Sequence, residues 1–162
     1  MEKIRVAIIG IGNCASALIQ GLEYYGNPAN NNTPEGMMAS NIGGYTASDI
    51  EVVAAFDVDQ RKVGKTLDRA IYAKPNCTIH IVEPEKFPKS NVIVEKGHIL
   101  DGISDHMKDY NTYPVDTTFL VDETTPSVDI VKRLQEVKAD ILINYLPVGS
   151  EKAAKYYAQC AI

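Results

Sequence analysis

The sequence has no apolar run that approaches the roughly 20 residues needed to span a bilayer. Its N-terminus also has no signal-peptide layout, because the apolar run Ile4–Ile9 is short and leads directly into a glycine turn. We therefore expect a cytoplasmic protein with no membrane partner.

Cysteine is scarce, and its three positions are far apart in the chain: Cys14, Cys77 and Cys160. An odd number of cysteines at this spacing is typical of a reducing compartment and provides no set of metal ligands. We therefore expect no metal site.

Basic residues form no stripe along the chain. The 16 Lys and Arg residues are scattered among 21 Asp and Glu residues, which gives a net charge of −5. This charge balance argues against nucleic acid as a partner. The length of 162 residues and the overall composition indicate one soluble domain with a substantial core.

The most informative feature that is present lies at the start of the chain, where the apolar run Ile4–Ile9 meets a Gly-x-Gly-x-x-Ala motif. This pattern predicts a buried strand, a glycine turn and a helix that begins at once. Gly10 allows the tight turn, Gly12 lets the backbone approach a pyrophosphate, and the small Ala15 lets the helix pack against the strand.

The first amides of this helix are unpaired donors at the positive end of the helix dipole, so they form an anion site. A dinucleotide is the expected ligand, because the motif stands between an apolar strand and an amphipathic stretch. The alternative is a doubly wound domain whose glycine turn binds nothing. We interpret Cys14, in the first turn of the helix, as a small residue beneath the cofactor rather than as a reactive thiol.

A second signal is Asp57, which ends the predicted strand Val52–Phe56. An acid at this place accepts hydrogen bonds from the adenosine ribose and favours NAD, although Arg61 and Lys62 leave room for NADP. The usual interval from the glycine motif is about 20 residues. Here it is longer, because residues 26–49 form an inserted loop rich in Asn, Gly, Pro and Ser. Alternatively, Asp57 caps a helix or is solvated.

Strands and helices alternate along the rest of the chain, which predicts an α/β fold with a doubly wound, mostly parallel sheet of the Rossmann type. The dinucleotide-binding domain spans residues 1–162. Apolar segments predict strands over 78–82, 91–95, 119–121 and 141–144, and helices that begin at Asp59, Thr125 and Ser150.

The last residues, 158–162, are helix-like and carry no Gly, Asn or Pro stop signal. A complete doubly wound sheet usually continues with another strand at this point. We therefore expect a sheet that is incomplete at its C-terminal edge and a further domain after residue 162.

Two loops follow predicted strands, at the sheet edge where ligands bind in open α/β sheets. In the loop 144–150, Tyr145 offers a flat face and a hydroxyl to a cofactor; the alternative is a rigid turn with a half-buried tyrosine. The loop 97–103 either reaches the cofactor or is only a connection. No histidine stands in a pattern that assigns it as acid, base or ligand, so the catalytic residues stay unknown.

Several segments carry a family resemblance: 6–16 with 20–25, 54–59 with 62–64, 91–94, 100–103, and 145–162. The block Leu-Pro-Val-Gly-Ser-Glu at 146–151 is far more specific than the glycine turn. Together these segments resemble bacterial myo-inositol-1-phosphate synthases over the whole chain.

The resemblance implies an NAD-dependent isomerase of inositol and phospholipid biosynthesis. In this family glucose 6-phosphate is oxidised at C5 by bound NAD, enolised, cyclised by an aldol-type step and reduced by the same NADH. By this resemblance the expected cofactor contacts are Gly10, Gly12, Asn13 and Cys14 along the pyrophosphate, Asp57 at the ribose, and Tyr145 and Leu146 along the cofactor.

Family members are considerably longer than this chain. The resemblance implies that their remaining part supplies a lysine-rich substrate site and the sheet that forms a homotetramer. We therefore expect these 162 residues alone to bind NAD weakly and to make no inositol phosphate. Two alternatives stay open: a dehydrogenase with net hydride transfer, and a non-catalytic domain that senses NAD or binds a partner.

Overall fold

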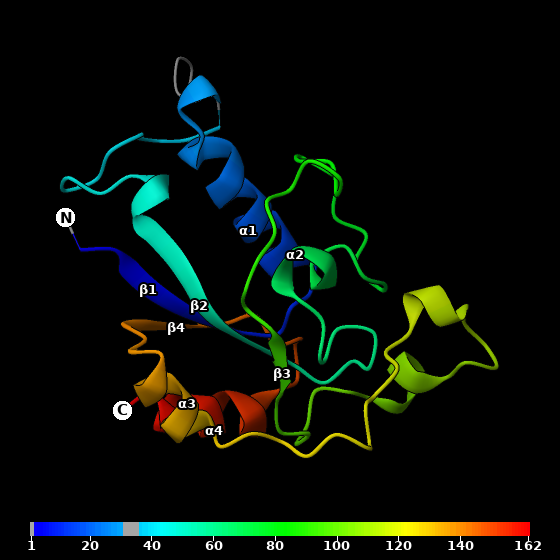
Figure 1. Ribbon diagram of the computed structural model, residues 1–162. Coiled ribbons are helices and arrows are strands. Elements are labelled where there is room, and N and C mark those ends of the chain that lie inside the picture. Colours follow the sequence, from blue (N-terminus) through cyan, green and yellow to red (C-terminus); the bar gives the residue numbers. More distant parts are fainter. Residues whose placement is uncertain (1, 31–35) are drawn as a thin grey trace.

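The computed structural model describes residues 2–30 and 36–162, and they form a parallel sheet with helices on both faces (Figure 1). The four strands lie in the order β3-β2-β1-β4, which confirms the predicted α/β class. The strands are β1 (Ile4–Ile9), β2 (Ile50–Asp57), β3 (Val94–Lys96) and β4 (Ile141–Asn144). The α-helices are α1 (Asn13–Gly26), α2 (Leu67–Ala70), α3 (Ile130–Glu136) and α4 (Glu151–Cys160).

The strand order reverses between β1 and β4, as it does in doubly wound sheets. β1 lies between these neighbours, since Ile9 is opposite Phe56 of β2 and Asn144 of β4. The carboxyl ends of β1, β2 and β4 therefore meet at one edge of the sheet. Ligands of such folds bind at this switch point.

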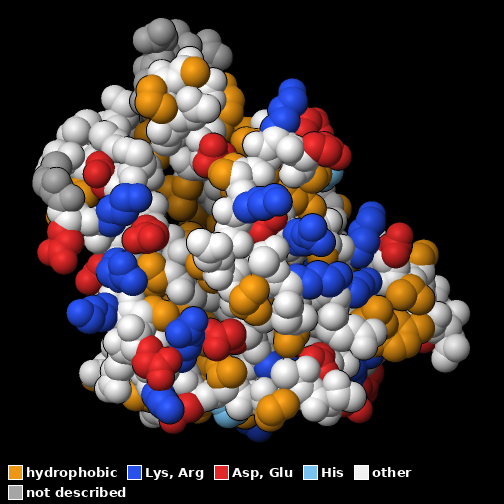
Figure 2. All heavy atoms as spheres, viewed as in Figure 1, with side chains coloured by type: hydrophobic (Ala, Val, Ile, Leu, Met, Phe, Trp, Pro, Cys, Tyr) orange, Lys and Arg blue, Asp and Glu red, His pale blue; other side chains and the backbone are white. Residues whose placement is uncertain are grey.

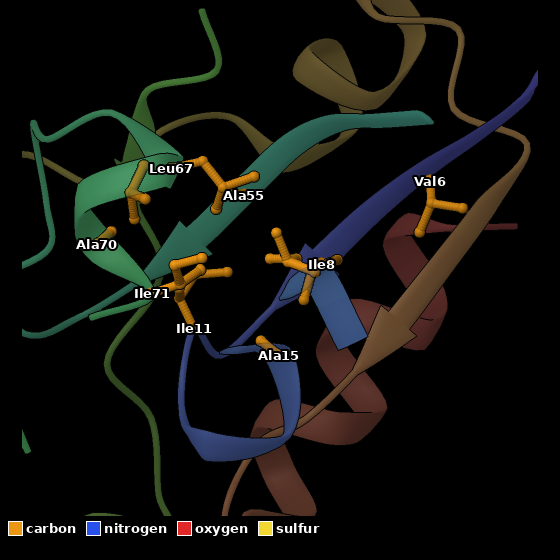
Figure 3. Packing of buried hydrophobic residues seen from close by; sticks show 10 residues of the cluster. Val6, Ile8, Ile11, Ala15, Ala55, Leu67, Ala70 and Ile71 are labelled. Atoms are coloured by element: carbon orange, nitrogen blue, oxygen red, sulfur yellow. The ribbon is translucent and has the colours of Figure 1, made fainter. Parts of the chain in front are cut away.

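Side chains of β1 alternate between two apolar cores, because successive residues of a strand point to opposite faces. Val6 and Ile8 pack on the side of α1 and α2 (Figure 3). Ala7 and Ile9 pack on the other side, against α3 and α4. Burial on both faces explains why β1 reads as a continuous apolar run rather than as an alternating one.

The helix expected from Asp59 is much shorter than predicted. Residues 60–64 form turns, and α2 covers only Leu67–Ala70. One cause is visible: Gly64 adopts a positive φ of 77°, which ends the turn that begins at Asp59. The Asp59 carboxylate accepts from the Arg61 amide at 2.8 Å, as an N-cap does, and it also binds the Arg61 guanidinium and the Leu120 amide. Leu67 and Ala70 of this short helix are buried.

The strand expected over 78–82 is absent. Gln20, a buried residue of α1, takes the place of a partner strand, because its Oε1 accepts hydrogen bonds from the amides of Ile81 (2.8 Å) and Val82 (3.2 Å). The segment 119–121 forms only a single antiparallel bridge, between Val121 and Asp59. The strand expected over 91–95 appears in shorter form as β3.

α3 begins after Asp129 and not after Thr125. The Val128 amide donates to the Lys96 carbonyl (3.0 Å), which keeps this segment extended beside β3. Asp129 then caps the helix, since its Oδ1 accepts from the Lys132 amide at 3.0 Å. At the end of the chain, Ser150 is the N-cap of α4 as expected.

The insertion 26–49 begins at the end of α1, and its last residues lie close to that place. A side chain at Gly26 would lie 3.6 Å from the Cα of Ser48, so the two ends of the insertion are in contact. Short 3-10 helices occupy Pro28–Asn30 and Ala47–Asp49, and the second one leads directly into β2. The long interval before Asp57 is therefore an excursion that leaves the pairing of β1 with β2 intact.

β4 is the outer strand on its side of the described sheet, and Ile141 is about half exposed there. Figure 2 shows acidic side chains interspersed with basic ones on the face that it presents. Within the described residues, no helix is both long and apolar enough to cross a bilayer.

Candidate functional site

A cavity of about 210 Å³ lies at the carboxyl edge of the sheet. Its walls are the glycine turn after β1, the end of β2, the loop after β4, residues 97–101 and one face of α4, and Lys62, Ile103 and Phe119 complete the lining. Of the seven residues expected to contact a cofactor, six line this cavity: Gly10, Gly12, Asn13, Asp57, Tyr145 and Leu146.

Gly10 joins the ends of three strands. Its amide donates to the Phe56 carbonyl (2.9 Å), and the Tyr145 amide donates to the Ile9 carbonyl (2.8 Å). Gly10 has a φ of +85°, and a Cβ at this position would lie 2.8 Å from the carbonyl oxygen of Tyr145. Only glycine fits here, because the chain must turn left-handed against a neighbouring backbone.

The space where a side chain would stand is free at Gly12, whereas at Gly10 it is filled by a neighbouring backbone. A Cβ on Gly12 would meet no atom within 4 Å, and its φ of −87° is ordinary. Gly12 is the N-cap of α1, and this helix start has neither a side-chain cap nor an acidic residue in its first turn. The first amides of α1 therefore keep their hydrogen-bonding capacity and their positive dipole end beside the cavity.

The starts of α3 and α4 differ from that of α1, because carboxylates already occupy them. Asp129 caps α3, and the Asp101 carboxylate accepts from the amides of Lys152 (2.7 Å) and Ala153 (2.9 Å) at the start of α4. These hydrogen bonds lower the pKa of Asp101. The long helix α1 thus offers the free anion-binding end that faces the cavity.

Asp57 is nearly buried on the cavity wall, and its carboxylate fixes the glycine turn. Oδ2 accepts from the Ile11 amide at 2.7 Å, while Oδ1 accepts from the amides of Val58 (2.7 Å) and Asp59 (2.8 Å). A carboxylate offers about four acceptor positions, so Asp57 can still accept a hydrogen bond from a ribose hydroxyl. The sequence predicts that Asp57 binds a ribose hydroxyl, but it does not predict that the same carboxylate holds the glycine turn.

Lys62 is buried beside the glycine turn and is one of the residues that line the cavity. Its Nζ donates to the Ile11 carbonyl (2.8 Å) and to Oδ1 of Asn76 (2.9 Å), and it is 4.0 Å from Oδ2 of Asp57. Burial lowers the pKa of Lys62, and the neighbouring carboxylates of Asp57 and Asp59 oppose this shift. The peptide units that flank Ile11 are thus held by Asp57 at the amide and by Lys62 at the carbonyl.

Asn13 and Cys14 are the first two residues of α1, and only Asn13 lines the cavity. Asn13 lies on the cavity wall, and its side-chain oxygen accepts from the Cys77 amide at 2.8 Å, which anchors the neighbouring loop. Cys14 is exposed and lies outside the cavity lining. A contact from Cys14 to a ligand in the cavity would therefore come from its amide and not from its thiol.

The loop 97–103 does reach the cavity, and it is fastened to α4. The hydroxyl of the buried Tyr157 accepts from the His98 amide at 2.8 Å. Gly102, with a φ of +85°, packs so closely on Ser150 that a Cβ would overlap it. These contacts join segments that are far apart in the chain, so no local pattern in the sequence predicts them.

Across residues 2–30 and 36–162, no three His, Cys, Asp or Glu side chains are grouped so that they could hold a metal ion. The groups that the described residues place at the cavity are the uncapped start of α1 and the Asp57 carboxylate.

Comparison with known proteins finds relatives that carry a curated name. The chain is 49% identical over 160 residues to an inositol-3-phosphate synthase of Mycolicibacterium smegmatis, covering 99% of this chain and 41% of the relative. A second inositol-3-phosphate synthase, from Corynebacterium glutamicum, is 48% identical over 162 residues, with 99% and 41% covered. The chain thus spans about 40% of the length of these curated relatives. No family model matches it.

A solved structure resembles the chain over the same extent. The crystal structure of a protein named Ari2 superimposes with a TM-score of 0.72 at 34% identity, and the match covers 99% of this chain and 42% of that one. The described fold therefore occurs as part of a longer chain.

Proposed function

Because the chain is homologous over nearly its whole length to part of the bacterial inositol-3-phosphate synthases, we propose that it is the NAD-binding part of such an enzyme. The observation that carries the cofactor assignment is the uncapped start of α1 beside Gly12, where a Cβ would meet only open space. This is the space that a diphosphate needs in order to reach main-chain amides.

The residues around this space fit the rest of a dinucleotide. The amides after Gly12 would hold the diphosphate, and the remaining acceptor position of Asp57 would hold a ribose hydroxyl. Tyr145 and Leu146 would lie along the cofactor on the β4 side. When bound, NAD would supply a reversible hydride acceptor, which an isomerase without net redox change requires.

The volume of the cavity limits how much of a dinucleotide these residues could enclose. Its 210 Å³ is below the roughly 300–1,000 Å³ of complete small-molecule sites, so a dinucleotide would be only partly enclosed. We propose that the sugar-phosphate site, with glucose 6-phosphate as substrate, and the homotetramer contacts belong to the remaining part of the enzyme. No catalytic residue is assigned to this chain.

Calorimetric titration with NAD, followed by incubation with glucose 6-phosphate, tests this proposal. We expect saturable binding of NAD, no accumulation of NADH and no inositol phosphate from these 162 residues alone. Lasting NADH formation with a hydroxy substrate would instead indicate a dehydrogenase. An NAD-dependent affinity for a protein partner, without consumption of sugar phosphate, would indicate a sensing domain.

A further inference from the structure

Two basic side chains, Arg61 and Lys62, follow the proposed ribose acid Asp57 at the end of β2. In dinucleotide-binding folds an arginine near this place accommodates the 2′-phosphate of NADP, whereas an acid binds the 2′-hydroxyl of NAD. This chain has both residue types. Cofactor choice therefore depends on whether either cation is available to a ligand.

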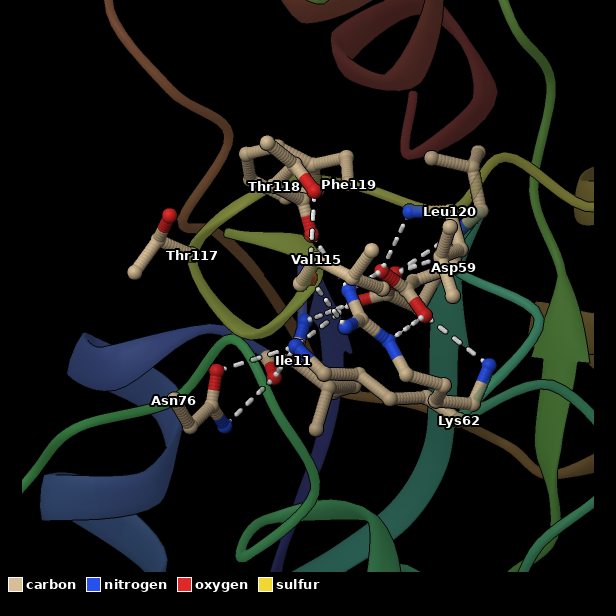
Figure 4. Close-up of polar contacts among 12 residues, drawn as sticks. Ile11, Asp59, Lys62, Asn76, Val115, Thr117, Thr118, Phe119 and Leu120 are labelled. Carbon is tan, nitrogen blue, oxygen red and sulfur yellow. Dashed lines mark hydrogen bonds and ion pairs between the residues drawn. The ribbon is translucent and has the colours of Figure 1, made fainter. Parts of the chain in front are cut away.

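Arg61 donates hydrogen bonds to Asp59, Val115 and Thr118, which are labelled in Figure 4. Its Nε and Nη2 donate to the two carboxylate oxygens of Asp59 at 2.9 and 2.6 Å, in a bidentate ion pair. Its Nη1 and Nη2 also donate to the carbonyls of Val115 (3.0 Å) and Thr118 (2.5 Å). These contacts use four of the five guanidinium N–H groups.

Asp59, the partner of Arg61, is itself rigidly placed. Its side chain is fully buried, and its Oδ2 also accepts from the Leu120 amide at 3.0 Å. The Asp59 amide donates to the Asp57 carboxylate at 2.8 Å. The ion pair therefore stands next to the proposed ribose acid, and the neighbouring Phe119 lines the cavity.

Lys62 lines the cavity, but its amino group is already engaged within the protein. Its Nζ donates to the Ile11 carbonyl and to Oδ1 of Asn76, and its side chain is 1% exposed. A 2′-phosphate would have to break these contacts, which also hold the turn, before it could pair with Lys62.

We propose that Asp59 determines cofactor choice by holding Arg61 in an ion pair, so that NAD is bound and the 2′-phosphate of NADP finds no cation. This inference rests on the proposed NAD site and adds a specificity-determining residue to it. Asp57 repels the 2′-phosphate directly, whereas Asp59 acts by withholding the arginine that would neutralise it.

Calorimetric titration of the purified protein with NAD and with NADP tests the inference in three variants: Asp59→Asn, Arg61→Ala, and the two combined. Asp59→Asn should lower the Kd for NADP by about tenfold or more, the scale of one charge-assisted hydrogen bond. Adding Arg61→Ala should remove that gain, because the released guanidinium causes it. The exposed Asp105, changed to Asn, is the control for the loss of one negative charge.

Two results would overturn the inference: an unchanged Kd for NADP in a folded Asp59→Asn protein, or a gain that persists in the double variant. If Asp59→Asn does not fold, Arg61→Ala alone still tests whether Arg61 is withheld from the 2′-phosphate. Its Kd for NADP should stay within about twofold of the parent protein, whereas a tenfold rise would show that Arg61 already contacts the phosphate. A parent protein that binds no NAD would instead overturn the proposed function, and this inference with it.

Discussion

Replacing Gly12 with valine is expected to raise the Kd for NAD by at least about 100-fold while the fold survives. The backbone at Gly12 has an ordinary φ, and a Cβ there would meet no protein atom within 4 Å. The valine side chain would therefore occupy the space proposed for the diphosphate, between the ligand and the amides of α1. The loss of a glycine N-cap should cost less than about 1 kcal/mol of stability.

Isothermal titration calorimetry with NAD measures this effect, and circular dichroism confirms the fold. Gly21→Val is the matched control, since Gly21 lies on the same helix, also has open space around it, and is outside the cavity lining. Equal NAD affinities for the two variants and the parent protein would place the cofactor elsewhere.

Replacing Gly10 with alanine should have its largest effect on stability, with a loss of about 2–5 kcal/mol in the free energy of unfolding. An alanine at a φ of +85° is strained, and its Cβ would lie 2.8 Å from the Tyr145 carbonyl oxygen. Neither backbone can move away easily, because the Gly10 amide is hydrogen-bonded to the Phe56 carbonyl and the Tyr145 amide to the Ile9 carbonyl. Urea denaturation of the purified protein provides the measurement.

Gly64→Ala separates the two causes of this loss. Gly64 has a similar φ of +77°, but a Cβ there would have no neighbour within 4 Å. Gly64→Ala should lower the free energy of unfolding by only about 1–2 kcal/mol, which is the cost of the backbone conformation alone. Equal losses at both glycines would show that the contact between Gly10 and Tyr145 has no energetic weight.

The parts of the fold that the sequence predicted well are those governed by local pattern. β1, β2 and β4 are apolar runs bounded by turn signals, and α1 follows its glycine turn at once. The errors have two causes. Gln20, which is distant in the chain, binds the amides of the expected strand 78–82, and Gly64, with its φ of +77°, shortens the helix expected from Asp59.

The candidate site shows the same division. The glycine motif and the acid at the end of β2 are sequence signals, and the structure places Gly10, Gly12 and Asp57 on one cavity. The contacts of Lys62 with Ile11 and of Asp101 with α4 join residues far apart in the chain. No periodicity or spacing reports such contacts, so only the folded chain reveals them.

The crystal structure of the protein in complex with NAD tests the central claim most directly. The account predicts diphosphate oxygens within hydrogen-bond distance of the amides that open α1, and a ribose hydroxyl on the Asp57 carboxylate. A nucleotide bound at another place, with side chains filling the space beside Gly12, would contradict it.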